Sequence, residues 1–255
     1  MTSSLDTKEP AVWFQRVTFY STLASLCPFI PVPWLDDWAR GWVDRRAVGA
    51  ALQPWGLASE PWQVELLAGQ GEAAKRPGCL LLGLLGAALR ALLRLVLGLA
   101  RKLLLFLAVK QASDCFSRAF HEGYLLHRAL ASGVIRAETL RSRPHLLSLR
   151  WAIEESCRQI DPRPLQQLIS RLLRGSRKLL SAAARSFASL LRRSRKSEAP
   201  AGYGDTVEAR EEALLGGLTA ALARSLWGER SYREELEKVF QENLARAGLL
   251  PPQQP

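Results

Sequence analysis

The chain has 255 residues, enough to bury a sizeable core as one large or two small domains. Leu, Ala and Arg dominate it, and no stretch shows the polar–apolar alternation of strands, so we predict an all-α protein. Four widely spaced cysteines exclude a disulfide-rich scaffold and a CxxC motif, while 35 basic against 24 acidic residues give a net charge of +11 and favour anionic partners.

The N-terminus carries acidic residues before its first apolar run. It lacks the cationic start and the small-residue cleavage site of a secretory signal. We therefore expect the chain to be cytoplasmic, with reduced cysteines that behave as small buried hydrophobes.

Helical patterns follow one another along the chain, separated by proline- and glycine-rich turns. Pro28 ends the first helix, Ser59 is predicted to cap a short helix, and Pro144 opens a later one. The apolar helix that starts at 79 either continues past Arg101 or breaks there into a second helix. We predict helices over 12–27, 34–52, 60–67, 79–101, 102–132, 143–160, 164–195, 206–226 and 231–247.

The clearest boundary is the linker KSEAPAGYGD at 196–205. It separates a helical domain, 12–195, from a C-terminal helical pair, 206–247, for which Asp205 and Glu208 form a candidate capping box. We expect the two tails to be disordered, namely residues 1–11 and 248–255. The predicted architecture is a multi-helix bundle around one very apolar central helix or helix pair, about 79–131.

Residues 79–109 are the most apolar stretch, and no acidic residue occurs from 73 to 113. At about 100° per residue, Arg90, Arg94 and Arg101 fall within about 40° of one another on a helix. The leucines favour membrane insertion about as much as the arginines oppose it, so a single span is marginal. Three interpretations stay open: a span whose arginines face a partner or headgroups, a helix on a membrane surface, and a core helix with a solvated arginine stripe.

The predicted helix 164–195 is also basic, with leucines between its cations and no acidic residue. Such helices are typical of membrane surfaces or partner-binding elements, and a core helix with a solvated outer face fits equally well. A tryptophan stripe at 34, 38 and 42 fits a core face or, less often, a membrane interface. We predict contacts with membrane headgroups or other phosphates for Arg90, Arg94, Arg101, Lys102, Arg174, Arg177, Lys178 and Arg185.

The chain shows little catalytic chemistry. His121 and Glu122 begin an HE pair, but the next histidine is six residues on, so the HExxH zinc geometry fails. Asp114, Arg118 and Glu122 are spaced four apart, which predicts a salt-bridged helix face. A functional alternative makes Asp114, Arg118 and His121 a polar patch in a cleft. We find no ligand set for a metal, no cofactor motif and no catalytic triad, and expect a protein that is not an enzyme.

Three strings resemble parts of uncharacterised helical bacterial proteins: PFIPVPWLDDWARGWVDRR at 28–46, LFLAVKQASDCFSRAFHEGYLL at 105–126 and ALARSLWGERSYREELEKVFQENL at 221–244. More loosely, the chain resembles the EcsC-like families, helical proteins with apolar, Gly-rich segments. The resemblance covers most of 20–245 and implies a helical fold. It brings no catalytic motif, so it implies no site residue. An Ala-rich composition with more Arg than Lys fits a GC-rich bacterial genome.

Together these features predict a non-enzymatic helical protein at the cytoplasmic face of a membrane. It would contact an anionic membrane surface or a membrane protein through 79–109 and 164–195. The alternative is a soluble helical interaction module that binds nucleic acid or an acidic partner. Against nucleic acid, the basic stretches lack interleaved aromatic residues, and the sequence identifies no small-molecule ligand.

Overall fold

The computed structural model describes residues 11–29, 35–70, 101–175 and 203–250, and all regular structure in these residues is helical. This confirms the predicted all-α, multi-helix bundle. The helices are α1 (Val12–Leu26), α2 (Leu35–Leu52), α3 (Pro61–Leu67), α5 (Arg101–Ala131), α6 (Ala137–Leu140), α7 (Arg143–Gln159), α8 (Arg163–Gly175), α10 (Tyr203–Gly228) and α11 (Arg230–Arg246), with 3₁₀ turns η1 (Cys27–Phe29) and η2 (Gln53–Trp55).

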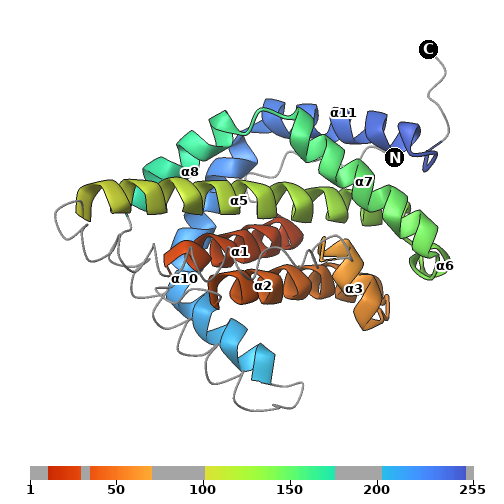
Figure 1. Ribbon diagram of the computed structural model, residues 1–255, viewed down its shortest axis with the longest axis horizontal. Helices are drawn as coiled ribbons and strands as arrows, with labels where there is room; N and C mark the ends of the chain where they lie inside the picture. The colour runs from red at the N-terminus through yellow and green to blue at the C-terminus, as the bar shows by residue number, and fades with distance from the viewer. Residues whose placement is uncertain (1–10, 30–34, 71–100, 176–202, 251–255) are drawn as a thin grey trace, which may run out of the picture.

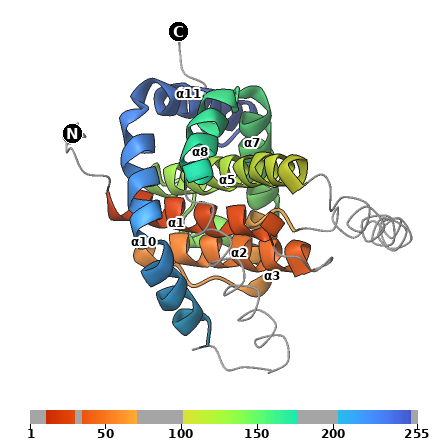
Figure 2. The same ribbon diagram turned by 90° about the vertical axis from the view of Figure 1, so that its left-hand side faces the viewer.

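The long helix α5 runs through the middle of the bundle. Figures 1 and 2 show α7, α8 and α11 on one side of it and α1, α2 and α3 on the other, with α10 crossing beside α1. The prediction of a central helix is therefore confirmed for 101–131, while residues 79–100 lie outside the described part of the chain.

Aromatic side chains on α5 form the centre of the core. Phe116, Phe120 and Tyr124 recur every four residues, so their rings lie on one face, with adjacent ring centroids 6.2 and 5.9 Å apart. Phe14 of α1 meets Phe120 edge-on at 5.5 Å. Each of these four side chains is at most 1% exposed. This cluster holds α1 against α5.

Gly123 allows α1 to approach α5 closely. A Cβ atom at this position would lie 3.2 Å from Cγ1 of Val17, closer than ordinary van der Waals contact. The lack of a side chain at position 123 therefore permits α1 and α5 to lie this close together.

The ends of the helices follow the prolines, but two predicted caps were wrong. Pro28 follows α1, and Pro144 lies in the first turn of α7, as predicted. Glu60, rather than Ser59, caps α3, because its backbone N–H donates to the Gln63 side chain while its own side chain accepts from the backbone. Asp205 cannot cap α10, since that helix already begins at Tyr203.

The C-terminal helices contribute to the same core as the preceding ones. α10 packs on α1 and α11 packs on α7. The fully buried Asn243 of α11 donates to the Ser156 hydroxyl (3.0 Å) and to the Gln159 side chain (3.3 Å), so a polar contact fixes how α11 sits on α7.

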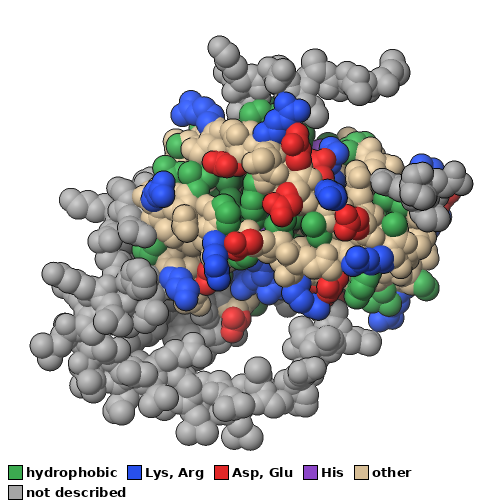
Figure 3. Space-filling view, turned by 90° about the horizontal axis from the view of Figure 1, so that it is seen from above, with side chains coloured by type: hydrophobic (Ala, Val, Ile, Leu, Met, Phe, Trp, Pro, Cys, Tyr) green, Lys and Arg blue, Asp and Glu red, His purple; other side chains and the backbone are tan. Residues whose placement is uncertain are grey.

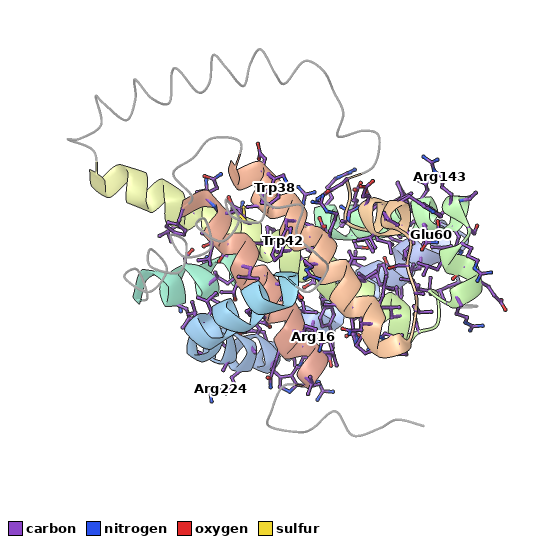
Figure 4. The ribbon with its side chains drawn as sticks, turned by 90° about the horizontal axis from the view of Figure 1, so that it is seen from below. Arg16, Trp38, Trp42, Glu60, Arg143 and Arg224 are labelled. Atoms are coloured by element: carbon purple, nitrogen blue, oxygen red, sulfur yellow. The ribbon has the colours of Figure 1, made fainter. Side chains whose placement is uncertain are left out.

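The sequence allowed membrane contact for the tryptophan stripe and for the predicted basic helix 164–195. Where the structure describes them, both pack against the rest of the protein. Trp38 and Trp42 lie along α2, partly buried against the core (Figure 4). In α8, Leu165 and Ile169 are buried against α5, while Arg171 is exposed. Residues 176–195 of the predicted basic helix lie outside the described residues.

The position of Phe120 makes it a test of the core. Phe120→Ala removes a ring that is 1% exposed, so we expect the free energy of unfolding to fall by about 3–5 kcal/mol in urea denaturation followed by circular dichroism. Leu147→Ala on α7 is the matched control, because Leu147 is 52% exposed, and its loss should stay below about 1 kcal/mol. Equal losses in both variants would contradict the central position of α5.

Candidate functional site

A cavity of about 480 Å³ lies between α1, α2 and α5, a volume typical of small-molecule sites. We call it the apolar pocket, because aliphatic and aromatic side chains form most of its wall. Five of the lining residues are alanines with short side chains: Ala47, Ala50 and Ala51 on α2, Ala68 just after α3, and Ala119 on α5. The apolar wall also includes Val17, Tyr20, Val43, Val48, Leu67, Leu126 and Ile153.

Exposed apolar and aromatic side chains mark the outer end of the pocket. Val12 at the start of α1 is 76% exposed and Trp55 in η2 is 46% exposed, and both line the cavity. Between them Trp13 stacks on His127, with ring centroids 3.8 Å apart and planes 9° apart. Arg16 donates to the backbone oxygen of Ala50 (3.1 Å), tying α1 to α2 at the rim (Figure 4). The rim therefore combines exposed apolar surface with one cation, Arg16.

His127, at the outer end of the pocket, is uncharged at neutral pH. Burial, and then the neighbouring Arg128, lowers the pKa of His127 to about 4. Its Nδ1 is buried and has no hydrogen-bond partner among the described residues. At neutral pH the imidazole is thus an uncharged ring that packs on Trp13 rather than a cation.

Two carboxylates, Asp44 and Glu122, lie at the inner end of the apolar pocket, and they differ in their hydrogen-bond partners. Glu122 of α5 accepts hydrogen bonds from Arg118 Nε (2.8 Å) and from Arg150 Nη1 of α7 (3.1 Å). Burial alone would raise the pKa of Glu122, but the two guanidinium groups outweigh it and hold that pKa below its ordinary value. Glu122 is therefore a fixed, fully paired anion at neutral pH.

Arg150 is the most buried charge of this group, with an 8% exposed side chain. It also donates from Nε to Glu154 (2.7 Å) and from Nη1 to the backbone oxygen of Leu67 at the end of α3 (3.1 Å). Gly69 adopts φ +70°, and a Cβ there would collide with the Arg150 guanidinium. Glycine is therefore favoured at this turn, both by the positive φ and by the guanidinium next to it.

Asp44 of α2 is the second carboxylate, and within the described residues no group donates a hydrogen bond to it. Burial, with the nearby Glu122, raises its pKa from 3.8 to about 6, against the attraction of Arg40, Arg118 and Arg150. It lies about 10 Å along α2 from the rim residue Ala51. The pocket thus has an apolar outer end and one unpaired acceptor at its inner end.

The predicted polar patch is brought together on the other side of Glu122. Asp114, Arg118 and His121 line a cleft of about 450 Å³ between α5, α7 and the start of α8, which we call the polar cleft. His121 is buried and hydrogen-bonded through Nε2 to the hydroxyl of Tyr232 (2.7 Å). Glu122 lines both the polar cleft and the apolar pocket.

Burial shifts the pKa values of two side chains that line the polar cleft, His121 and Cys157. Burial lowers the pKa of His121 to about 4 against the opposing effect of Glu122, so the imidazole is neutral. Burial and then Glu122 raise the pKa of Cys157 to about 12, so its thiol is protonated and a weak nucleophile. Within the described ranges no group of three His, Cys, Asp or Glu side chains is arranged to hold a metal ion.

Most of the predicted phosphate-contacting residues cannot be placed. Arg90, Arg94, Arg177, Lys178 and Arg185 lie outside the described residues. Arg101 and Lys102 lie in the first turn of α5 and Arg174 in the last turn of α8, where the side chains are not described. No helix in the described part of the chain is both long enough and apolar enough to be a candidate membrane span.

The residues that sequence reasoning missed are those of the apolar pocket. Sequence spacing identifies Glu122 only as part of a salt-bridged helix face, and nothing in the sequence marks Asp44, Trp13, Trp55 or His127 as parts of one pocket. Comparison with protein-family models, with curated proteins and with solved structures finds no match for this chain. The relationship to EcsC-like proteins stays a prediction, and function must be argued from the pocket and the sequence.

The raised pKa of Asp44 predicts a stability effect. The folded chain holds this proton more tightly than the unfolded chain does, so ionisation of Asp44 between about pH 4 and pH 6 lowers the free energy of unfolding. The variant Asp44→Asn has no carboxylate to ionise at this position, so its free energy of unfolding does not fall in this way as the pH rises. We expect the variant to exceed the unmodified chain by about 1–3 kcal/mol near pH 7.5 and by less than about 0.5 kcal/mol near pH 3.5.

Urea titrations at the two pH values measure this difference directly. Glu154→Gln is the control, because it removes a carboxylate that is 47% exposed and hydrogen-bonded to Arg150, and it should not stabilise the chain as the pH rises. A pH-independent difference for Asp44→Asn would show that this carboxylate is not protonated on burial.

Proposed function

We propose that this chain is a non-enzymatic helical binding protein that takes a small, mainly apolar molecule into the apolar pocket. The observation that carries the proposal is the pocket itself: about 480 Å³ bounded mostly by apolar side chains and reached past the exposed Val12 and Trp55. Burial of apolar surface supplies about 25 cal/mol per Å², so such a cavity favours an apolar occupant. The pKa of His121, about 4, makes it a weak base, and the raised pKa of Cys157 keeps its thiol protonated, which supports the non-enzymatic proposal.

A second proposal concerns location, and the sequence composition supports it. The acid-free stretch 79–109 and the acid-free predicted helix 164–195 combine apolar and cationic side chains, as membrane-surface elements do. We propose that the chain associates with the cytoplasmic face of a membrane through these two stretches. An apolar ligand would then be drawn from the bilayer that the chain contacts.

A nucleic-acid partner receives less support from the described surface. On the face formed by α7, α8 and α11, acidic and basic side chains alternate over short distances, as Figure 3 shows. Pairs such as Arg230–Glu234 (2.7 Å) and Arg158–Glu155 (2.8 Å) account for part of this pattern. A nucleic-acid site requires a continuous basic patch or stripe.

Filling the apolar pocket tests the first proposal. N-phenyl-1-naphthylamine, a dye that fluoresces in apolar surroundings, should bind the unmodified chain and be displaced by decanol. Ala119→Leu places a larger side chain in the wall and should weaken dye binding by about tenfold or more, since that factor corresponds to only about 1.4 kcal/mol.

Ala131→Leu is the matched control, because Ala131 is exposed at the end of the same helix and does not line the pocket. It should bind the dye as the unmodified chain does. Failure of the unmodified chain to bind the dye, or equal binding by Ala119→Leu, would contradict the pocket proposal.

Flotation with lipid vesicles tests the second proposal. The chain should float with phosphatidylglycerol vesicles and not with phosphatidylcholine vesicles. Joint replacement of Arg90, Arg94 and Arg101 by Gln should weaken vesicle binding about 100-fold, because each cation near an anionic surface contributes about 1 kcal/mol. Gln at the exposed Arg141, Arg158 and Arg163 removes the same charge and should change binding far less. An unmodified chain that stays at the bottom of the gradient refutes membrane association.

A further inference from the structure

The inner end of the apolar pocket selects the polar group of its ligand. Asp44 and Glu122 are the acidic side chains that line this cavity, and they are not equivalent. Both oxygens of Glu122 already accept hydrogen bonds, Oε1 from Arg118 and Oε2 from Arg150. Asp44 receives no hydrogen bond from any described residue. At the inner end of the pocket a bound molecule therefore finds one carboxylate that accepts no hydrogen bond from the described residues.

The charges that face Asp44 come from three helices. Arg40 lies one turn earlier on α2, Arg118 and Glu122 come from α5, and Arg150 comes from α7. Arg118 and Arg150 are hydrogen-bonded to Glu122, and Arg40 donates to Sγ of Cys115 (3.8 Å). These cations attract Asp44 through space but make no hydrogen bond with it. An anionic ligand group would have to approach two carboxylates, whereas a donor group would complete the shell of Asp44.

We propose that the molecule held in the apolar pocket carries an amino or hydroxyl group that donates a hydrogen bond to Asp44, with its apolar part running toward Val12 and Trp55. The proposal rests on the proposed function, since it names the chemistry of the ligand of that same pocket. An amino group stays protonated at neutral pH, like the lysine ammonium with a pKa of about 10.4, and forms an ion pair with Asp44. A fatty carboxylate of equal length binds more weakly, because Asp44 and Glu122 repel its head group at the inner end.

Competition with the bound dye tests this ligand chemistry. Decylamine, decanol and decanoate share a ten-carbon chain and differ in the head group, so each is titrated against N-phenyl-1-naphthylamine below its micelle concentration. We expect decylamine and decanol to displace the dye from the unmodified chain at concentrations at least about tenfold lower than decanoate. Decanoate that competes as well as decylamine overturns the proposal.

Asp44→Asn separates the head-group contact from the pocket as a whole. The amide keeps an acceptor oxygen but loses the charge, so decanol should bind about as before, while decylamine should lose about tenfold and decanoate should gain. Dye binding should persist in this variant, which shows that the pocket is intact. If the variant leaves the order of the three competitors unchanged, Asp44 does not contact the head group. If the unmodified chain binds no dye, the pocket proposal fails instead, so the two failures are distinguishable.

Discussion

The buried guanidinium of Arg150 is the interaction on which the geometry of this site depends. Removing such a charge from water costs several kcal/mol unless its hydrogen bonds are replaced. Here Glu122, Glu154 and the backbone oxygen of Leu67 accept from Nε and Nη1, while Nη2 has no partner among the described residues. One side chain of α7 thus links α5, α7 and the end of α3. The turn at Gly69 packs directly on the guanidinium, which ties the local backbone to the same charge.

The unusual state of Asp44 follows from how this network distributes its cations. Arg118 and Arg150 both bond to Glu122, and the neighbouring Arg40 bonds to a thiol. Asp44 therefore receives long-range attraction without a contact, and burial raises its pKa to about 6. Glu122, at almost the same place, is held as an anion. The two carboxylates thus differ: Glu122 pairs with guanidinium groups from α5 and α7, and Asp44 accepts no hydrogen bond from the described residues.

The sequence predicted the helices well because prolines and helical periodicity are local signals. It predicted Asp114, Arg118 and His121 as one patch for the same reason, since residues three and four apart share a helix face. The apolar pocket could not be predicted because its lining residues come from helices that are far apart in the sequence, among them α1, α2, α5 and α7. The wrong caps at Ser59 and Asp205 have a similar origin: several polar residues near a helix start can serve, and small differences in backbone geometry decide among them.

The alanines in the pocket wall have a consequence for how this protein can vary. The cavity exists largely because Ala47, Ala50 and Ala51 on one helix and Ala119 on another are short, and all four lie beside the aromatic cluster rather than within it. A longer aliphatic residue at any of them reduces the volume of the cavity. If the pocket holds the molecule that we propose, single substitutions at these positions would change the length of ligand that it accepts, with the core aromatic residues and the charged network left as they are.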